Sequence, residues 1–133
     1  MKLIKTKLNE SSKKIIVHFY FEGEAGDSEQ VNLVILDPEL DFDPSQKNMR
    51  PTITQIWSGL SWFDALLKFE DAAPEGAYAW VVTRDTAKYD DFRYFGGLKD
   101  RAGLDGGNGR VLMSTSGFQA GSVGTMVIEF KKD

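Results

Sequence analysis

The sequence has no cysteine and a single histidine among its 133 residues. Without cysteine, disulfide bonds, thiolate nucleophiles and zinc sites built on cysteine are excluded, so packing must stabilise the fold. The longest apolar runs, such as residues 15–21, are far shorter than the roughly 20 residues of a membrane-spanning helix. Residues 1–14 have lysines at intervals and lack the apolar stretch of a secretory signal. We therefore expect a protein made and kept in a cytoplasm-like environment, with no membrane contact.

A concentration of basic residues is also missing. The chain has 16 Lys and Arg against 20 Asp and Glu, a formal charge of -4 and a pI near 5.0. No cluster of Lys and Arg provides the electrostatic footprint of nucleic-acid binding, so we predict no direct contact with DNA or RNA. The length and the average hydrophobic content predict one domain over residues 1–133.

What the sequence does contain is a series of short apolar runs separated by turn residues. Residues 2–8 are either a first strand or an extended N-terminal arm. Residues 15–22 alternate, which predicts a strand, and a loop at 23–28 leads to a second apolar run at 31–36. We expect these two runs to pair antiparallel. The residues expected to face the core from the first run are Ile15, Val17, Phe19 and Phe21.

The middle of the chain begins with an irregular segment. Residues 37–51 contain three prolines, which forbid a central strand and disfavour helix, and so long a connection is usually functional, binding or mobile. Residues 52–58 and 61–70 then look like two strands joined near Gly59. A helix is the competing interpretation of residues 62–69, but their period-2 alternation favours a strand.

The C-terminal part continues the strand pattern. Strands are predicted at 78–83, 90–95, 110–115 and 123–132, with Met126, Ile128 and Phe130 facing the core. Turn signals at 74–76, at Gly96-Gly97 and at a glycine-rich tip over 100–109 separate them. Eight or nine strands without interleaved helices predict an all-β fold, a single-domain antiparallel β-sandwich of jelly-roll type.

An acidic loop is the first candidate for chemistry. Asp37, Glu39, Asp41 and Asp43 place carboxylates at alternate positions, as calcium sites do. An EF-hand loop starting at Asp37 would need glycine and glutamate where this chain has Phe42 and Asn48. A solvated loop rich in Asx turns accounts for the same residues, so calcium remains the alternative and we predict no metal site.

Other catalytic patterns are weak. His18 lies in an apolar strand, where a structural histidine bonded to backbone or to a neighbouring strand is the expected role. The neighbouring carboxylates Asp90 and Asp91, like those at 70–71, diverge to opposite faces of a strand, and no GxSxG elbow is present. The glycine-rich residues 106–109 lack the ending of a phosphate loop. We expect no catalytic residues, no cofactor and no enzyme activity; a small β-sandwich hydrolase is the least favoured alternative.

Aromatic residues are numerous. Most should pack in the core, as is usual in sandwiches, and those left on an outer face mark protein or sugar contacts. Trp57, Trp62 and Tyr94 are the candidates for exposure, since polar residues such as Gln55 and Asp64 neighbour the two tryptophans. The aromatic residues of this group are Trp57, Trp62, Tyr78, Trp80, Phe92, Tyr94 and Phe95.

Three stretches carry a resemblance. IWSGLSWFDALLKFE at 56–70, WVVTRDTAKYDDFRYFGGL at 80–98 and VLMSTSGFQAGSVGTMVIEFKK at 111–132 resemble small virion proteins of tailed bacteriophages that decorate or cement the capsid. The resemblance rests on the pattern of strand-forming residues and on the sequence segments FRYFGG and GSVGTM. It implies a non-enzymatic structural protein that self-associates as a dimer or trimer, binds the assembled major capsid protein and lies on the capsid exterior after assembly in the host cytoplasm.

A docking role of this kind needs surface residues. The predicted partner interface comprises Trp57, Trp62 and Tyr94 together with Asp41, Phe42 and Asp43 of the acidic loop. Residues 1–8 and 37–51 are the segments expected to touch the shell. Two alternatives remain open: a carbohydrate-binding β-sandwich module that uses exposed aromatics, and a virion protein associated with the tail.

Overall fold

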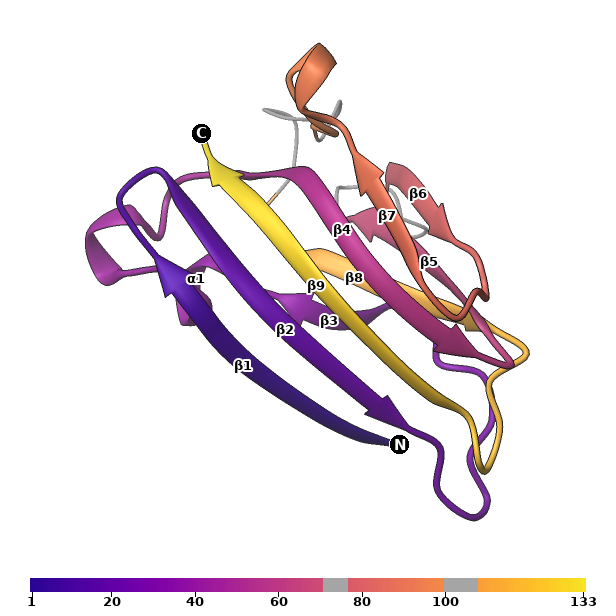
Figure 1. Ribbon diagram of the computed structural model, residues 1–133. Coiled ribbons are helices and arrows are strands. Elements are labelled where there is room, and N and C mark those ends of the chain that lie inside the picture. Colours follow the sequence, from indigo (N-terminus) through magenta and orange to yellow (C-terminus); the bar gives the residue numbers. More distant parts are fainter. Residues whose placement is uncertain (71–76, 100–107) are drawn as a thin grey trace.

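The computed structural model describes residues 1–70, 77–99 and 108–133, and for residues 77 and 78 it describes the backbone alone. Within these ranges the chain forms nine strands, one helical turn and two 3-10 turns (Figure 1). In chain order they are β1 (Lys2–Glu10), β2 (Lys14–Glu22), β3 (Leu33–Leu36), α1 (Pro38–Asp41), η1 (Pro44–Gln46), β4 (Pro51–Ser61), β5 (Asp64–Phe69), β6 (Ala77–Val82), β7 (Lys88–Asp91), η2 (Arg93–Phe95), β8 (Val111–Ser116) and β9 (Val123–Lys132).

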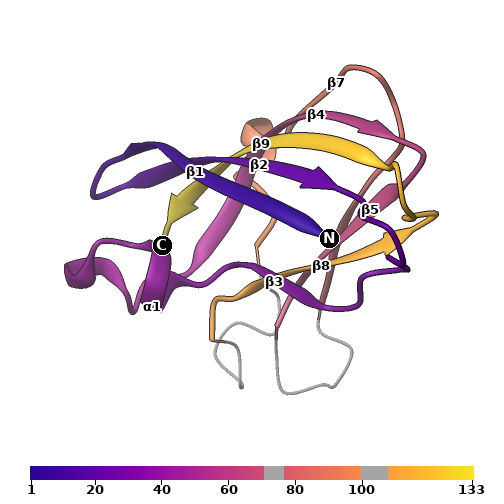
Figure 2. The same ribbon diagram turned by 90° about the horizontal axis from the view of Figure 1, so that it is seen from below.

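The strands form two antiparallel sheets. One has the order β1-β2-β9-β4-β7 and the other β3-β8-β5-β6. Figure 2 shows them as two layers, with the five-stranded sheet above the four-stranded one. The predicted all-β sandwich is confirmed.

The pairing of the strands is nested. From β2 onward, the first strand pairs with the last, the second with the last but one, and so on inward: β2 with β9, β3 with β8, β4 with β7 and β5 with β6. A long antiparallel hairpin rolled up on itself gives this arrangement, which is the jelly roll. β1 is an addition that extends the five-stranded sheet beyond β2.

The core lies between the sheets, and the alternation of the longest strands fills it. Ile15, Val17, Phe19 and Phe21 of β2 are buried, as are Met126, Ile128 and Phe130 of β9, and both predictions are therefore confirmed. β9 also needs a glycine here. A Cβ on Gly124 would lie 2.7 Å from Leu60 Cδ2 and from Phe63 Cζ, so these side chains occupy the space in which a larger residue would stand.

Two N-terminal expectations change. Residues 2–8 belong to β1, which pairs with β2 along its whole length, so the extended-arm alternative is wrong. The run at 31–36 contributes only β3, which pairs with β8 in the opposite sheet, whereas β2 already has β1 and β9 as neighbours. The predicted pairing of these two runs is therefore wrong, because the connection after β2 crosses between sheets.

The proline-rich segment is more regular than predicted. The Asp37 side chain accepts a hydrogen bond from the Glu39 amide and caps α1, which has Pro38 in its first turn. Asp43 caps η1 in the same way, by accepting from the Ser45 amide. Proline has no amide hydrogen to lose at the start of a helix, so these prolines begin helical turns instead of preventing them.

The remaining boundaries are partly corrected. Residues 64–69 form a strand and not a helix, as predicted, but β4 runs on to Ser61 and the chain turns at Trp62, whose φ is 74°. β7 ends at Asp91, and residues 93–95 form η2, so the strand predicted over 90–95 is wrong at its end. Gly96 and Gly97 end η2 with φ of 91° and 94°.

The predicted turn at 74–76 and most of the tip at 100–109 lie outside the described residues. The predicted strands at 78–83, 110–115 and 123–132 are confirmed as β6, β8 and β9.

Candidate functional site

The carboxylates do not converge. Over the described residues no three His, Asp or Glu side chains lie together in a way that could hold a metal ion. Asp91 forms a bidentate pair with Arg93 at 2.9 Å, and this bond lowers the pKa of Asp91 to about 2. Asp90 points to the opposite face of β7, as predicted, with Lys88 Nζ 3.8 Å away.

The acidic loop is engaged in local structure. The Asp37 carboxylate caps α1 and accepts from Arg110 Nε at 3.2 Å. Asp41 is 2.9 Å from Lys5 Nζ and accepts from the Asp37 amide. Asp43 caps η1. Capping, ion pairing and local hydrogen bonds thus engage each of these three carboxylates.

His18 bonds to a neighbouring strand. Its ring Nε2 lies 2.6 Å from the Thr125 hydroxyl of β9, and the side chain is half-buried on the outer face of the five-stranded sheet. The expected structural role is therefore supported by a specific partner. The outer face to which it belongs is the most distinctive surface of the described molecule.

Antiparallel register aligns one row of side chains across this face. Cα partners share a face, so each strand adds one side chain to the row. The row consists of Thr6 (β1), His18 (β2), Val127 (β9), Trp57 (β4) and Tyr89 (β7).

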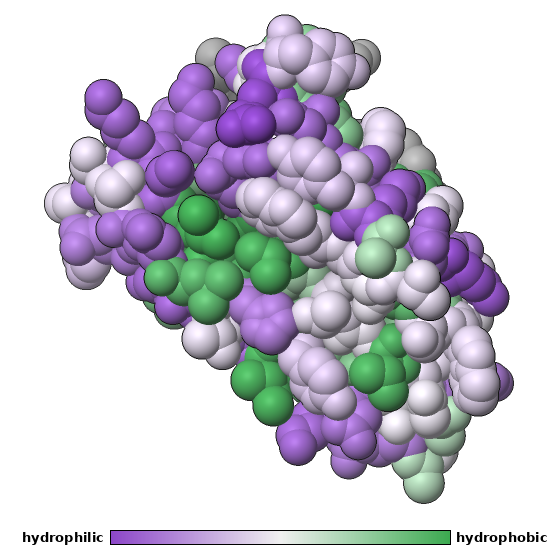
Figure 3. Space-filling view, viewed as in Figure 1, coloured by the Kyte–Doolittle hydropathy of each residue, from purple (hydrophilic) through white to green (hydrophobic). Residues whose placement is uncertain are grey.

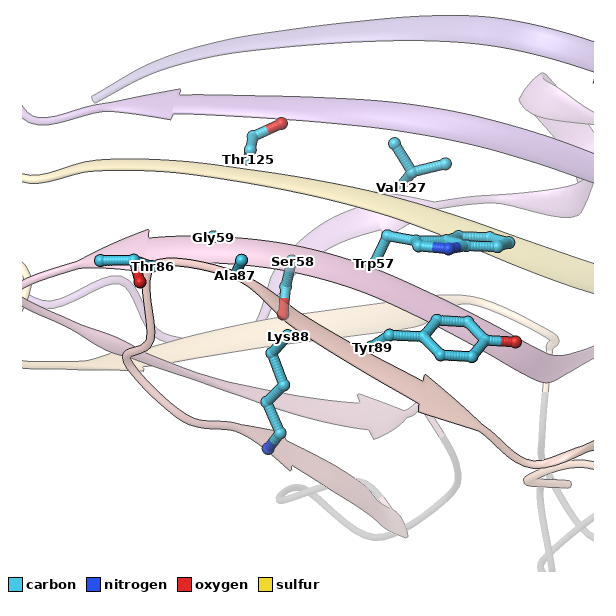
Figure 4. Close-up of a pocket in the computed structure, with 9 residues that line it drawn as sticks. All are labelled: Trp57, Ser58, Gly59, Thr86, Ala87, Lys88, Tyr89, Thr125 and Val127. Carbon is cyan, nitrogen blue, oxygen red and sulfur yellow. The ribbon is translucent and has the colours of Figure 1, made fainter.

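An aromatic groove occupies the β4–β7 side of the row. The Trp57 and Tyr89 rings lie 5.2 Å apart at 30°, and both are exposed, by 40% and 47%. They stand beside a shallow depression of about 460 Å³ whose floor includes Gly59 and Val127 (Figure 4). The Tyr89 hydroxyl donates to Gln55 Oε1 at 2.5 Å, which fixes the ring. Desolvation, and after it the Asp91 charge, raise the pKa of Tyr89, so it remains a donor at neutral pH.

An apolar strip continues from the groove across β9, β2 and β1. Its most exposed members are Leu8 (55%) and Ile4 (45%), and the half-buried Ile16 and Val127 lie between Leu8 and Trp57. Figure 3 shows green apolar atoms in the middle of this face, with hydrophilic purple side chains toward the end where the C-terminus lies. We call the outer surface of the five-stranded sheet, with its groove and strip, the outer face.

A basic depression of about 340 Å³ borders the strip at that hydrophilic end. Its floor includes Glu129, which accepts hydrogen bonds from Thr54 Oγ1 and Gln55 Nε2, both at 2.8 Å. Burial raises the pKa of Glu129, but these bonds and the nearby Lys14 and Arg93 charges outweigh burial, and the net pKa is lowered. The cations around the depression are Lys13, Lys14, Arg93 and Lys131.

The predicted interface residues do not gather at one place. Trp57 lies in the groove, whereas Trp62, exposed by 62%, stands at the β4–β5 turn and Tyr94, exposed by 86%, stands on η2. The exposure predicted for all three is confirmed. Asp43 is exposed and Asp41 is half-buried in its pair with Lys5.

Phe42 is the clear exception. It is only 3% exposed and its ring lies under the Lys132 ammonium at 5.0 Å, so it belongs to the core and cannot contact a partner. The flanking aspartates made the segment look like surface, but Asp43 caps η1 and Asp41 pairs with Lys5, whereas Phe42 is buried.

Three members of the outer face were missed by sequence reasoning, namely Ile16, Tyr89 and Val127, whereas Ile4 and Leu8 lie in the segment 1–8 that was expected to touch the shell. A signal did exist for two of them. Ile16 and Val127 occupy the outward positions of strands whose inward positions are already apolar. Apolar residues on both faces of a strand leave apolar surface on the outside of the sheet, and such patches mark interaction sites.

Comparisons of the sequence and of the fold with known proteins identify no relative. No protein-family model matches the chain, and comparisons with curated proteins and with solved structures found no significant match. No helix of the described residues is long and apolar enough to cross a membrane.

Proposed function

We propose that this protein is a non-enzymatic virion structural protein that binds the assembled major capsid protein of a tailed bacteriophage and stabilises the head. The docking part of the proposal is supported by one observation, the exposed aromatic and apolar outer face. The capsid part is supported by the resemblance of 56–70, 80–98 and 111–132 to decoration and cement proteins. Its location would be the capsid exterior.

The face of the sheet is better suited to docking than its β1 edge. β1 is a free edge, but its Lys5 and Lys7 pair with the inward positions Phe19 and Val17 and so point toward the sandwich side. A bulge at Leu8 interrupts the edge as well. Inward lysines and bulges both discourage a second strand from pairing. A partner therefore meets side chains of the face.

The fold is compatible with the proposal by analogy. Double-sheet jelly rolls occur in viral capsid and lectin domains, although a fold alone does not specify a function. A rigid sandwich repeated over a symmetric shell also suits weak individual contacts, because multivalent attachment strengthens them. Self-association as a dimer or trimer stays a prediction, which sedimentation velocity measures.

Co-sedimentation with capsids of the phage that encodes the chain tests the proposal. We expect the unmodified protein to pellet with capsids and the double variant Trp57→Ser/Leu8→Ser to lose at least tenfold in affinity. Val31→Ser is the matched control, since Val31 is 76% exposed in the loop before β3, which belongs to the opposite sheet. Equal binding of the double variant and the control would refute docking through this face.

Copy number provides a second test. Mass spectrometry of purified virions should find hundreds of copies of the chain per particle. A few copies would redirect the proposal to a tail-associated protein, and near-absence would eliminate a virion role. Deleting residues 1–8 is a poor test, because it removes most of β1 and uncovers β2.

A carbohydrate-binding module is the second candidate, and the aromatic groove favours it. The tilted Trp57 and Tyr89 rings beside an open depression are the kind of surface on which a sugar ring stacks. A glycan array followed by calorimetry separates the two candidates. Saturable sugar binding that is lost in Trp57→Ala would favour the carbohydrate function, whereas a silent array favours capsid attachment.

A further inference from the structure

The basic depression holds a like-charged pair that the fold does not need. Lys14 of β2 and Lys131 of β9 are direct cross-strand partners, and both side chains are about half exposed on the outer face. Like charges directly opposite each other in a sheet are destabilising. Lys13 and Arg93 add two more cations at the rim, although the chain as a whole has a charge of -4.

The surrounding carboxylates compensate these cations incompletely. Lys14 Nζ is 3.7 Å from Glu129 and Lys131 Nζ is 3.4 Å from Asp133, so neither pair is a short hydrogen bond. Arg93 is committed to Asp91, and the Lys13 ammonium has no acidic partner in the described part of the chain. Four cations and three carboxylate side chains therefore lie at the depression, which leaves one positive charge in surplus.

We propose that the basic depression binds a carboxylate of an acidic segment on the protein partner that covers the apolar strip. This inference rests on the proposed function, in which a protein docks on the outer face. The apolar strip and the basic depression are contiguous, which supports a partner that is both apolar and acidic. Ile16 follows Lys14 on the same side of β2, and Val127 precedes Glu129 and Lys131 on the same side of β9. The strip therefore adjoins the basic depression, and a partner that covers the strip also lies against the cations of the depression.

The charge of the site favours a carboxylate over a doubly charged anion. Glu129 on the floor repels anions, and the single surplus charge matches one carboxylate better than a phosphate dianion. The partner surface is thus predicted to be apolar with Asp or Glu at one side. Contact at this site should weaken with salt, because its cations are exposed.

An NMR titration of the whole chain with a triglutamate peptide tests the site by itself. We expect saturable shifts of the amides of Lys14, Glu129 and Lys131 at low salt, and at least a tenfold loss of affinity in Lys14→Glu/Lys131→Glu. Lys2→Glu/Lys47→Glu is the matched control with the same change of net charge, and it should bind as the unmodified protein does. No shifts, or tighter binding of inorganic phosphate or heparin, would overturn the carboxylate assignment.

Capsid binding separates the failure of this inference from that of the proposed function. We expect Lys14→Glu/Lys131→Glu to reduce co-sedimentation at least tenfold at low salt and less at high salt. Loss of binding in Trp57→Ser/Leu8→Ser with full binding in the lysine variant would refute the carboxylate contact and leave docking intact. Full binding of both variants would refute docking through the outer face altogether.

Discussion

Glu10 and Lys132 form an ion pair, and we expect the loss of the Glu10 charge to destabilise the protein more than the loss of the Lys132 charge. Lys132 is fully buried and its ammonium donates to Glu10 at 2.8 Å, to the Ser11 carbonyl at 2.8 Å and to Gln46 Oε1 at 2.6 Å. Glu10 is 18% exposed and also accepts from Lys7 Nζ. Burial raises the pKa of Glu10, but the bonds from Lys132, Lys7 and a backbone amide outweigh it and lower the pKa to about 2.

The two single substitutions leave different groups behind. Glu10→Gln keeps a buried ammonium without its counter-charge, and breaking a buried pair in this way costs roughly 3–5 kcal/mol. We expect about 3 kcal/mol, because Ser11 and Gln46 still accept from the ammonium. Lys132→Met leaves a carboxylate that retains Lys7 and some water, and the thioether can pack on Phe42. Apolar replacements of buried charges are often tolerated, so we expect about 1 kcal/mol.

Urea unfolding at pH 7 of the unmodified chain, both single variants and the double variant measures these values. The double variant should resemble Lys132→Met, because the buried charge is gone in both. The slope with denaturant should stay unchanged, so that midpoints report stability. A larger loss in Lys132→Met than in Glu10→Gln would refute the claim that the uncompensated ammonium dominates. The pair also holds the β1–β2 turn, through Ser11, next to Lys13 of the basic depression.

Three further predictions concern stability and assembly. Gly124→Ala should lower the free energy of unfolding by about 2 kcal/mol, because the added methyl group meets Phe63; an unchanged melting temperature would contradict this crowding. Since the pKa of Glu10 is depressed from 4.5 to about 2, its contribution to stability is complete above pH 4.5 and is lost as the pH falls toward 2. Chemical denaturation across this window should be less pH-dependent in Glu10→Gln than in the unmodified protein, and parallel curves would count against the pair. Lys5→Val/Lys7→Val should produce concentration-dependent oligomers in light scattering, because the free edge loses its inward charges, and a strictly monodisperse variant would show that the bulge alone protects it.

The sequence predicts the strands and their inward faces well, because this information is local. The alternation of Ile15, Val17, Phe19 and Phe21 needs only a period of two and a core on one side. The same reasoning favoured a strand over a helix for residues 62–69, of which 64–69 form β5. It was wrong where short-range chemistry competes with hydrophobicity: aspartate caps and prolines at 37–46 form helical turns and turn Phe42 inward.

The sequence by itself determined an all-β chain with Trp57 exposed and without an evident catalytic constellation. Only the tertiary structure decided which strands are neighbours, since β2 and β9 come from opposite ends of the chain and no local pattern specifies their pairing. The outer face depends on that pairing. Tyr89 reaches Trp57 through the β4–β7 register, and the four cations of the basic depression come from the β1–β2 turn, β2, η2 and β9. Residue types and periodicity are read along the chain, whereas a surface is made by contacts across it.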